Sequence, residues 1–170
     1  MKKCIFLMVC LCLMTIQASA QDVLNEVLRT SEKTLNDTTK DMEARKVALF
    51  KFDACTYMRD KLLPPVVMLS KNVNRDSLNV RIRFLNEQTY AMSVFITLYQ
   101  KRMNEASKKN KTLVSTLFKQ ATFDHKLFND EDTEYTLTYY NAQDFPLPFT
   151  LDCNWVKTLA FVRSIDWTKL

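Results

Sequence analysis

The longest regular pattern of apolar positions in this chain runs from Ser77 to Ala106. Apolar residues recur there at alternating steps of four and three and form two neighbouring stripes. The first stripe contains Leu78, Ile82, Leu85, Thr89, Met92, Ile96, Tyr99 and Met103, and the second contains Phe84, Gln88, Ala91, Phe95, Leu98 and Arg102. Two adjacent stripes predict a helix whose apolar face is broad enough to contact neighbours on two sides. We therefore expect residues 77–106 to form the central helix of a bundle, with Asp76 as its N-cap.

Shorter helical patterns flank this segment. They cover residues 22–35, the stretch from a Thr38–Asp41 capping box to Leu63, residues 112–122 and residues 153–165. Pro64 and Pro65 end the second of these helices, because neither can donate the helical hydrogen bond. The apolar residues 66–69 should then cross one end of the bundle. The polar residues 107–111 mark either a break between two helices or a bend in one long rod, and the sequence leaves both open.

The turns between these helices must form without glycine, because the chain contains none. Backbone with positive φ then falls to Asn or Asp, and sharp hairpin turns become unfavourable. Asn110 is a candidate for such a left-handed turn, and Asp152 is the expected N-cap of the last helix. A fold dominated by β-sheet is disfavoured on this ground.

The helical period disappears between Phe123 and Asp152. Residues 135–140 alternate in the manner of a strand, and the apolar residues of 145–151 alternate across two prolines. These prolines predict an extended piece that cannot pair as a central strand. The expected fold is therefore an all-α bundle of four or five helices, with an extended segment rich in aromatic residues and proline packed on one side.

The first twenty residues have the order of a secretory signal. Two lysines precede a short apolar run, and small residues follow it up to Ala20. We expect cleavage after Ala20, a single helical domain over 21–170, and residence in the periplasm or outside the cell. Lipidation at Cys10 or Cys12 is the alternative, although bulky residues precede both. No later apolar run is long enough to cross a membrane.

Signal cleavage would remove Lys2 and Lys3 and lower the formal charge from +5 to +3, which is too mild to imply nucleic acid as a partner. The cations gather near the end of the central helix, at Lys101, Arg102, Lys108, Lys109, Lys111 and Lys119. Such a run is typical of a solvated helix end. It also suits an acidic partner or an anionic lipid surface.

Signal cleavage would leave two cysteines, Cys55 and Cys153. In an oxidising compartment they can pair, and the bridge would join the first half of the chain to its end. The other interpretation is two separate buried thiols that fill space as small hydrophobic groups.

Aromatic residues concentrate in the region that lacks helical periodicity. As a candidate surface for a ligand or partner we single out His125, Tyr135, Tyr139, Tyr140, Phe145 and Trp155. Aromatic side chains with polar tips can stack on and hydrogen-bond a sugar or a peptide. The alternative is that these large side chains fasten an irregular segment to the bundle.

Catalytic and metal chemistry find little support. His125 invites a hydrolase hypothesis, but no nucleophile stands near it in a recognisable motif. The acidic residues 129–134 offer carboxylates to calcium, yet they lack the spacing of an EF-hand and also read as a solvated loop. We assign no catalytic residue and expect no cofactor.

The signal ending in Ala18, Ser19 and Ala20 and followed by Gln21 resembles those of exported proteins of Bacteroidota, and the remainder resembles uncharacterised secreted proteins of that group. The resemblance implies that Asp37–Thr39 and Asp76–Leu78 match an O-glycosylation pattern, although both also read as helix caps. It implies no known activity.

Three functions follow as hypotheses. The first is a non-enzymatic interaction or structural protein of the cell envelope, which contacts another envelope protein through the aromatic segment 123–155. The second is a binder of a small, glycan-like ligand that uses the same side chains. The third is a hydrolase that depends on His125.

Overall fold

The computed structural model describes residues 23–69, 74–137 and 145–169. Their helices are a first segment over 23–36, α2 (Met42–Leu62), α3 (Pro65–Leu69), α4 (Arg75–Glu105), α5 (Lys111–Asp124), α6 (Thr133–Leu137), α7 (Trp155–Ser164) and the short 3-10 helix η1 (Trp167–Lys169). No β-strand occurs in these ranges. The predicted all-α fold is confirmed.

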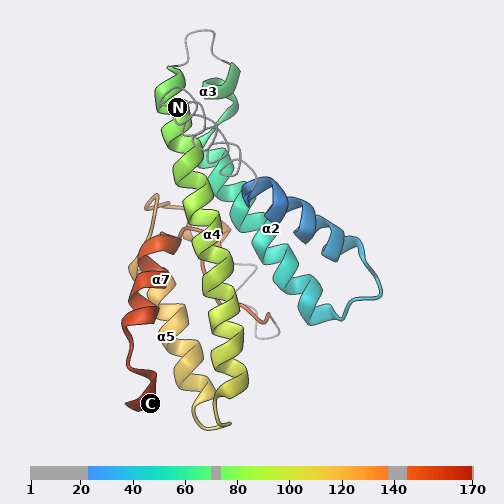
Figure 1. The fold of residues 1–170 in the computed structure, drawn as a ribbon, viewed down its shortest axis with the longest axis vertical. Coiled ribbons are helices and arrows are strands. Elements are labelled where there is room, and N and C mark those ends of the chain that lie inside the picture. The colour runs from blue at the N-terminus through green and yellow to red at the C-terminus, as the bar shows by residue number, and fades with distance from the viewer. Residues whose placement is uncertain (1–22, 70–73, 138–144, 170) are drawn as a thin grey trace, which may run out of the picture.

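Helix α4 is the central element of the molecule (Figure 1). It packs against α2, α5 and α7, and α5 also packs against α7. Its middle part supplies the core, where Leu85, Met92 and Phe95 are at most 1% exposed. The two apolar stripes therefore predicted this helix and its neighbours correctly.

The question left open at residues 107–111 is settled by the helix bounds. Helix α4 ends at Glu105 and α5 begins at Lys111, so the chain forms two helices and not one bent rod. Helix α5 returns alongside α4 in the opposite direction (Figure 1). The expected left-handed turn at Asn110 is wrong, because this residue has φ −91°. Among the described residues, positive φ occurs only at Asn129, with φ 52°.

Two N-caps lie elsewhere than expected. Helix α2 is capped by Asp41, whose side chain accepts a hydrogen bond from the Ala44 backbone, and not by Thr38. Helix α4 is capped by Asn74, which accepts from the backbone of Asp76. The sequence offers several capping side chains within a few residues at each site, so residue type alone does not identify the one that is used.

The segment 145–151 is extended, as predicted, and its side chains enter the core. Phe149 is completely buried, and its ring contacts Phe50 and Phe95 at centroid distances of 6.0 and 5.1 Å. Edge-on aromatic contacts of this kind stabilise a core beyond the area that they bury. The segment therefore contributes side chains to the core of the bundle.

The strand predicted over 135–140 is wrong within the described residues. Residues 133–137 form helix α6, which begins where Asp132 accepts a hydrogen bond from the Tyr135 backbone at 2.9 Å. The buried Thr136 faces the extended segment, and its carbonyl accepts from the Leu151 backbone at 3.4 Å. A strand needs a partner edge, and none lies beside this segment in the described parts of the chain.

Residues 65–69 form the short helix α3, which lies at one end of α4 (Figure 1). Its side chains lie mostly outside the core, because Val66 is 82% exposed and Met68 is 52% exposed. None of the helices in the described ranges is long and apolar enough to span a bilayer.

Cys55 and Cys153 are free thiols, each fully buried, so the bridge that the sequence allowed is not formed in this structure. The Cys153 sulfur lies 3.2 Å from the Thr158 hydroxyl, and the Cys55 thiol is hydrogen-bonded to Thr89. Burial raises the pKa of the Cys55 thiol to about 12 and also raises the pKa of Cys153. The two cysteines are therefore separate buried thiols, which is the second interpretation that the sequence allowed.

Candidate functional site

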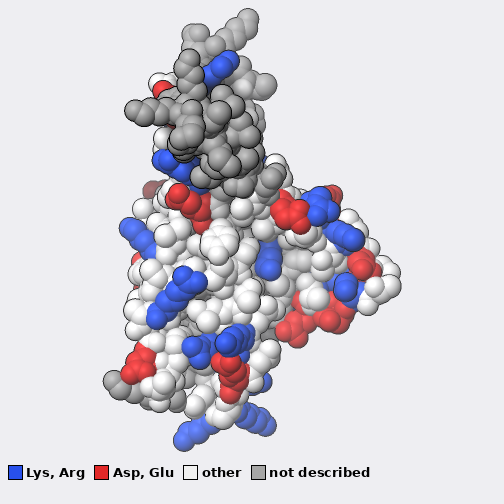
Figure 2. Space-filling model, in the orientation of Figure 1, with Lys and Arg blue, Asp and Glu red and all other residues white. Residues whose placement is uncertain are grey.

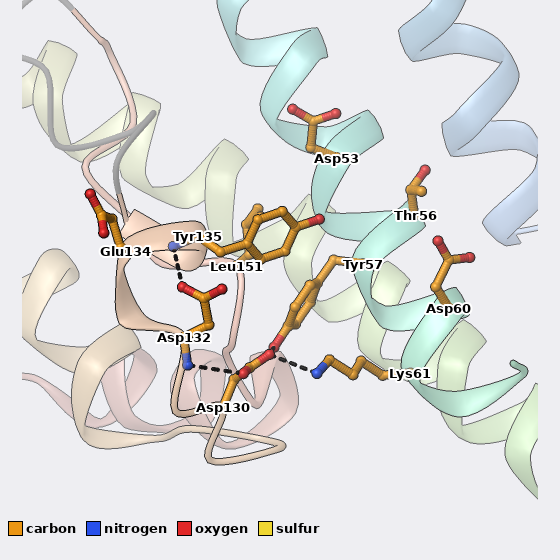
Figure 3. A pocket seen from close by; sticks show the side chains of 10 residues that line it. All are labelled: Asp53, Thr56, Tyr57, Asp60, Lys61, Asp130, Asp132, Glu134, Tyr135 and Leu151. Carbon is orange, nitrogen blue, oxygen red and sulfur yellow. Dashed lines mark hydrogen bonds and ion pairs between the residues drawn. The ribbon is translucent and has the colours of Figure 1, made fainter.

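An open cleft of about 920 Å³ lies between α2 and the segment that leads into α6 (Figure 3). We call it the acidic cleft. It is lined by Asp53, Thr56, Tyr57, Asp60, Lys61, Asp130, Asp132, Glu134, Tyr135 and Leu151. These side chains carry five carboxylates and one ammonium group, although the whole chain has a formal charge of +5.

Helix α2 forms one wall of the cleft, because the lining residues recur at helical spacing. Asp53, Tyr57 and Lys61 follow one another at steps of four residues and therefore share one face of the helix. Thr56 and Asp60 form the neighbouring row at the same step. Figure 3 shows Tyr57 and Lys61 directed at Asp130, which belongs to the opposite wall.

Asp130 joins the two walls of the cleft. Its Oδ2 lies 2.7 Å from the Lys61 ammonium and accepts a hydrogen bond from the Tyr57 hydroxyl at 2.9 Å. These two contacts lower the pKa of Asp130 to about 2, with Lys61 as the larger cause. The same contact raises the pKa of Lys61, and burial together with the carboxylate raises the pKa of Tyr57. Asp130 and Lys61 therefore stay charged, and the Tyr57 hydroxyl stays protonated, over the whole physiological pH range.

Asp152 holds the second wall in place. It is 1% exposed, and its carboxylate accepts hydrogen bonds from the backbone of Leu127, Phe128 and Asp130 at 3.0, 2.8 and 2.8 Å. The expected role of Asp152 as the N-cap of the last helix is therefore wrong. Asn154 caps α7 instead. A buried carboxylate needs several donors, and the consecutive amides of an irregular loop supply them.

Tyr135 is the most accessible aromatic side chain of the cleft. It is 62% exposed, and its ring centroid lies 6.3 Å from that of Tyr57. The Tyr57 ring is in turn fixed by an edge contact with Phe128 at 5.8 Å. The cleft thus presents one exposed ring supported by one immobilised ring.

The structure separates the candidate residues that the sequence grouped together. Tyr135 lies in the cleft, whereas Phe145 and Trp155 are 9% and 0% exposed and belong to the core. Tyr139 and Tyr140 lie outside the described residues. The two buried rings fasten the irregular segment to the bundle, which is the alternative that the sequence left open.

His125 lies apart from the cleft and lines neither of the two cavities described here. Its ring makes an edge contact with Phe161 at 5.7 Å, and its backbone carbonyl accepts a hydrogen bond from Asn154 at 2.7 Å. The imidazole makes no hydrogen bond with another residue of the described ranges. His125 therefore connects the end of α5 to the start of α7 and has no partner for catalysis among these residues.

Two carboxylates of the loop proposed for calcium are engaged by other groups of the protein. Asp130 pairs with Lys61, and Asp132 caps α6. Across the part of the chain that the structure describes, no three His, Cys, Asp or Glu side chains are grouped so that they could hold a metal ion.

The second cavity, of about 430 Å³, lies between the start of α2 and the end of α4. Its lining includes one acid, Glu43, and one base, Lys46, together with Tyr99 and Met103. Its charges balance, so it lacks the electrostatic character of the acidic cleft.

The basic residues noted in the sequence lie at the far end of the bundle, where α4 is joined to α5. Figure 2 shows Lys and Arg side chains gathered at this lower end of the molecule. Lys108, Lys109 and Lys111 are exposed there, whereas Arg102 is held by Glu105 at 3.4 Å. This pattern fits a solvated helix end.

A comparison of the chain with known protein families, curated proteins and solved structures finds no match in any of the three. The chemistry of the acidic cleft is therefore the basis for assigning a function. Carboxylates and aromatic rings around an open cavity can bind cations and hydrogen-bond donors.

Proposed function

We propose that this protein is a non-enzymatic interaction protein of the cell envelope and that the acidic cleft is its contact surface. The proposal is carried by the contrast between Tyr135, which is 62% exposed in the cleft, and the buried Phe145 and Trp155. An exposed aromatic ring with polar neighbours beside a cavity is typical of binding surfaces. The contact surface expected over 123–155 is thereby narrowed to the part that faces α2.

The envelope location rests on the pattern of the first twenty residues, and residues 1–22 lie outside the described part of the structure. Cell fractionation followed by N-terminal sequencing tests it. A chain that begins at Gln21 in the periplasmic or extracellular fraction supports the proposal. An uncleaved chain in the cytoplasm contradicts it.

A small, glycan-like ligand is the second candidate. Tyr135 offers an exposed ring on which a sugar can stack, and the neighbouring carboxylates offer acceptors for its hydroxyl groups. The hydrolase hypothesis gains no such observation, because His125 lines neither described cavity.

The experiment compares capture of envelope components by three forms of the tagged, full-length protein: wild type, Tyr135→Ala and Tyr90→Ala. Tyr90 is the matched control, because its side chain is also 62% exposed but lies on α4 and lines neither described cavity. We expect Tyr135→Ala to lose a component that the other two forms retain. A protein component supports the interaction protein, and a glycan supports the second candidate.

Equal capture by all three forms would contradict the proposed surface. Thermal unfolding of each form is measured in parallel. Both substitutions remove an exposed side chain and should change the free energy of unfolding by no more than about 0.5 kcal/mol.

A further inference from the structure

We infer that helix α3 and the first part of α4, residues 75–84, form a surface that contacts a lipid bilayer with anionic headgroups. We call this part of the molecule the α3 end. The inference goes beyond the proposed function, because the α3 end shares no residue with the acidic cleft. It is carried by the exposed apolar side chains of the α3 end, by their place at one end of the molecule, and by the arginines beside them.

The α3 end projects beyond the core of the bundle (Figure 1). Helix α4 has no buried residue over positions 75–84, and all of its buried side chains belong to residues 85–99. The guanidinium group of Arg81 donates a hydrogen bond to the Leu62 carbonyl at 3.0 Å. This bond ties the chain that leads into α3 to the first part of α4, so the two pieces of the α3 end lie at the same end of the molecule.

The α3 end exposes several apolar side chains. Val66 is the most exposed large apolar side chain among the described residues, at 82%, and Met68 and Val80 are 52% and 55% exposed. The sequence of α3, Pro-Val-Val-Met-Leu, contains no charged or polar side chain. Exposed apolar side chains that gather in one place are typical of surfaces that bind a protein or a membrane.

The shape of the α3 end favours a bilayer over a segment of another protein. Neither of the two described cavities includes any of its residues, so its apolar side chains lie on a projection and not in a groove. A peptide strand or an amphipathic helix usually docks against a groove or a sheet edge. The interface of a bilayer accepts projecting apolar side chains without such a matching surface, and their burial among the acyl chains is favourable.

Arginine side chains supply the charge that an anionic headgroup attracts. The charged residues of the α3 end are three arginines and one aspartate, namely Arg75, Arg81, Arg83 and Asp76. Arg75 and Arg83 are exposed, and their guanidinium groups make no hydrogen bond or ion pair with another described residue. Arg83 shares a helix face with the exposed Val80, three residues before it. A long cationic side chain can thus reach the headgroups while its apolar neighbours enter the acyl region.

The test is cosedimentation of the protein, purified in the form that the expressing cells release, with lipid vesicles. The vesicles contain phosphatidylcholine alone, or phosphatidylcholine with about one third phosphatidylglycerol, which carries a negative charge. The apolar variant is Val66→Ser/Met68→Ser. Its matched control is Leu113→Ser/Val156→Ser, which replaces two apolar side chains of α5 and α7 that are 40% and 44% exposed.

A second pair of variants tests the charge of the α3 end. The arginine variant is Arg75→Gln/Arg83→Gln. Its matched control is Lys108→Gln/Lys109→Gln, which removes two exposed cations from the opposite end of the bundle, where α4 is joined to α5. Both variants remove the same charge, so a difference between them reflects the position of the cations.

We expect the wild type and both controls to bind the anionic vesicles alike. The apolar variant should bind them at least about tenfold more weakly, because two side chains no longer enter the acyl region. The arginine variant should bind them at least about fivefold more weakly, and the wild type should bind neutral vesicles about tenfold more weakly than anionic ones. Circular dichroism checks that each variant is folded, and the comparison of the two lipid compositions uses the wild type alone.

Insertion into the acyl region is measured with brominated lipids, whose acyl chains quench the fluorescence of a tryptophan that enters them. The reporter is Val66→Trp, and its control is Val156→Trp on α7. We expect the bound Val66→Trp protein to show quenching beyond that of the wild type, and the bound control to show none. Equal quenching of the two would mean that the α3 end does not enter the bilayer.

Four further results would overturn the inference. They are absence of binding of the wild type to anionic vesicles, equal binding of the wild type and the apolar variant, loss of binding in the lysine control but not in the arginine variant, and a wild-type dimer in light scattering that the apolar variant converts into a monomer. The last result would identify a second copy of the chain as the occupant of the α3 end. The capture experiment with Tyr135→Ala uses a different surface, so each proposal can fail without the other.

Discussion

Asp152 is the residue on which the geometry of the acidic cleft depends most directly. It is not one of the residues that line the cleft, yet its buried carboxylate accepts three backbone hydrogen bonds from residues 127–130. Asp130, the residue that joins the two walls, is one of these three donors. The loop is thereby held from the core side by Asp152 and from the α2 side by Lys61 and Tyr57.

Replacement of Asp152 by alanine should destabilise the fold. The substitution leaves three buried amide groups without an acceptor, and we expect a loss of about 3 kcal/mol in the free energy of unfolding. Urea denaturation followed by circular dichroism measures this loss. Asp124→Ala, at an exposed position, is the control and should change stability by about 0.5 kcal/mol or less. Equal effects of the two substitutions would show that the Asp152 carboxylate does not hold the loop.

The contact between Asp130 and Lys61 predicts how stability depends on pH. The pKa of Asp130 falls from 3.8 to about 2 in the folded protein. A carboxylate with a lowered pKa stabilises the fold fully above its unfolded pKa and loses this contribution as the pH falls toward its folded pKa. The stability difference between wild type and Asp130→Asn should therefore be constant at neutral pH and shrink between about pH 4 and about pH 2.

Urea denaturation at several pH values checks this expectation, with Asp60→Asn as the control. Asp60 is an exposed acid of the same cleft. A difference between wild type and Asp130→Asn that stays constant down to about pH 2 would show that Asp130 has no lowered pKa.

The two buried thiols should be unreactive in the folded protein. Cys55 and Cys153 are each 0% exposed, and burial raises the pKa of both thiols, so neither forms the reactive thiolate. A thiol reagent such as Ellman's reagent should react with neither residue before unfolding and with both after it. Rapid reaction of the folded protein would contradict their burial, and absence of thiols after unfolding would indicate a disulfide.

At the scale of elements, periodicity predicted the helices well because each one buries a stripe. Helices α2, α4, α5 and α7 coincide with the segments that carry helical spacing. Alternation over a few residues predicted the wrong element. Residues 135–140 alternate as a strand would, but α6 forms over Thr133–Leu137 because Asp132 caps it and because no strand lies beside it in the described ranges.

The acidic cleft could not be predicted from the sequence in the same way. Its walls come from residues far apart in the chain, such as Tyr57 and Asp130, which are separated by 73 positions. The available signals were the acidic residues 129–134 and the acids seven residues apart on α2. Only the fold brings these two groups of acids together around one cavity.

The extended segment should behave as a core element and not as a surface loop. Phe149 is fully buried among Phe50, Phe95 and Tyr99. Its replacement by alanine should cost about 4 kcal/mol in the free energy of unfolding, because it removes a large buried side chain and leaves a cavity. Tyr135→Ala, in the exposed part of the same aromatic region, should be nearly neutral. Similar costs for both, measured by urea denaturation, would contradict the separation of this region into core and surface.

At the scale of the whole molecule, opposite charges occupy different places. Acidic side chains line the cleft between α2 and α6, and basic side chains gather where α4 is joined to α5 (Figure 2). A chain with a mild overall charge therefore carries acidic and basic side chains on separate parts of its surface.

The most direct test of the account is an NMR titration of the ¹⁵N-labelled protein with the envelope component that the wild type captures and Tyr135→Ala does not. We predict that the amide signals that shift belong to residues 53–61 and 130–135, the two walls of the acidic cleft, while those of residues 101–119 remain unchanged. Shifts confined to another part of the molecule, or none at all, would contradict the assignment of the cleft as the binding surface.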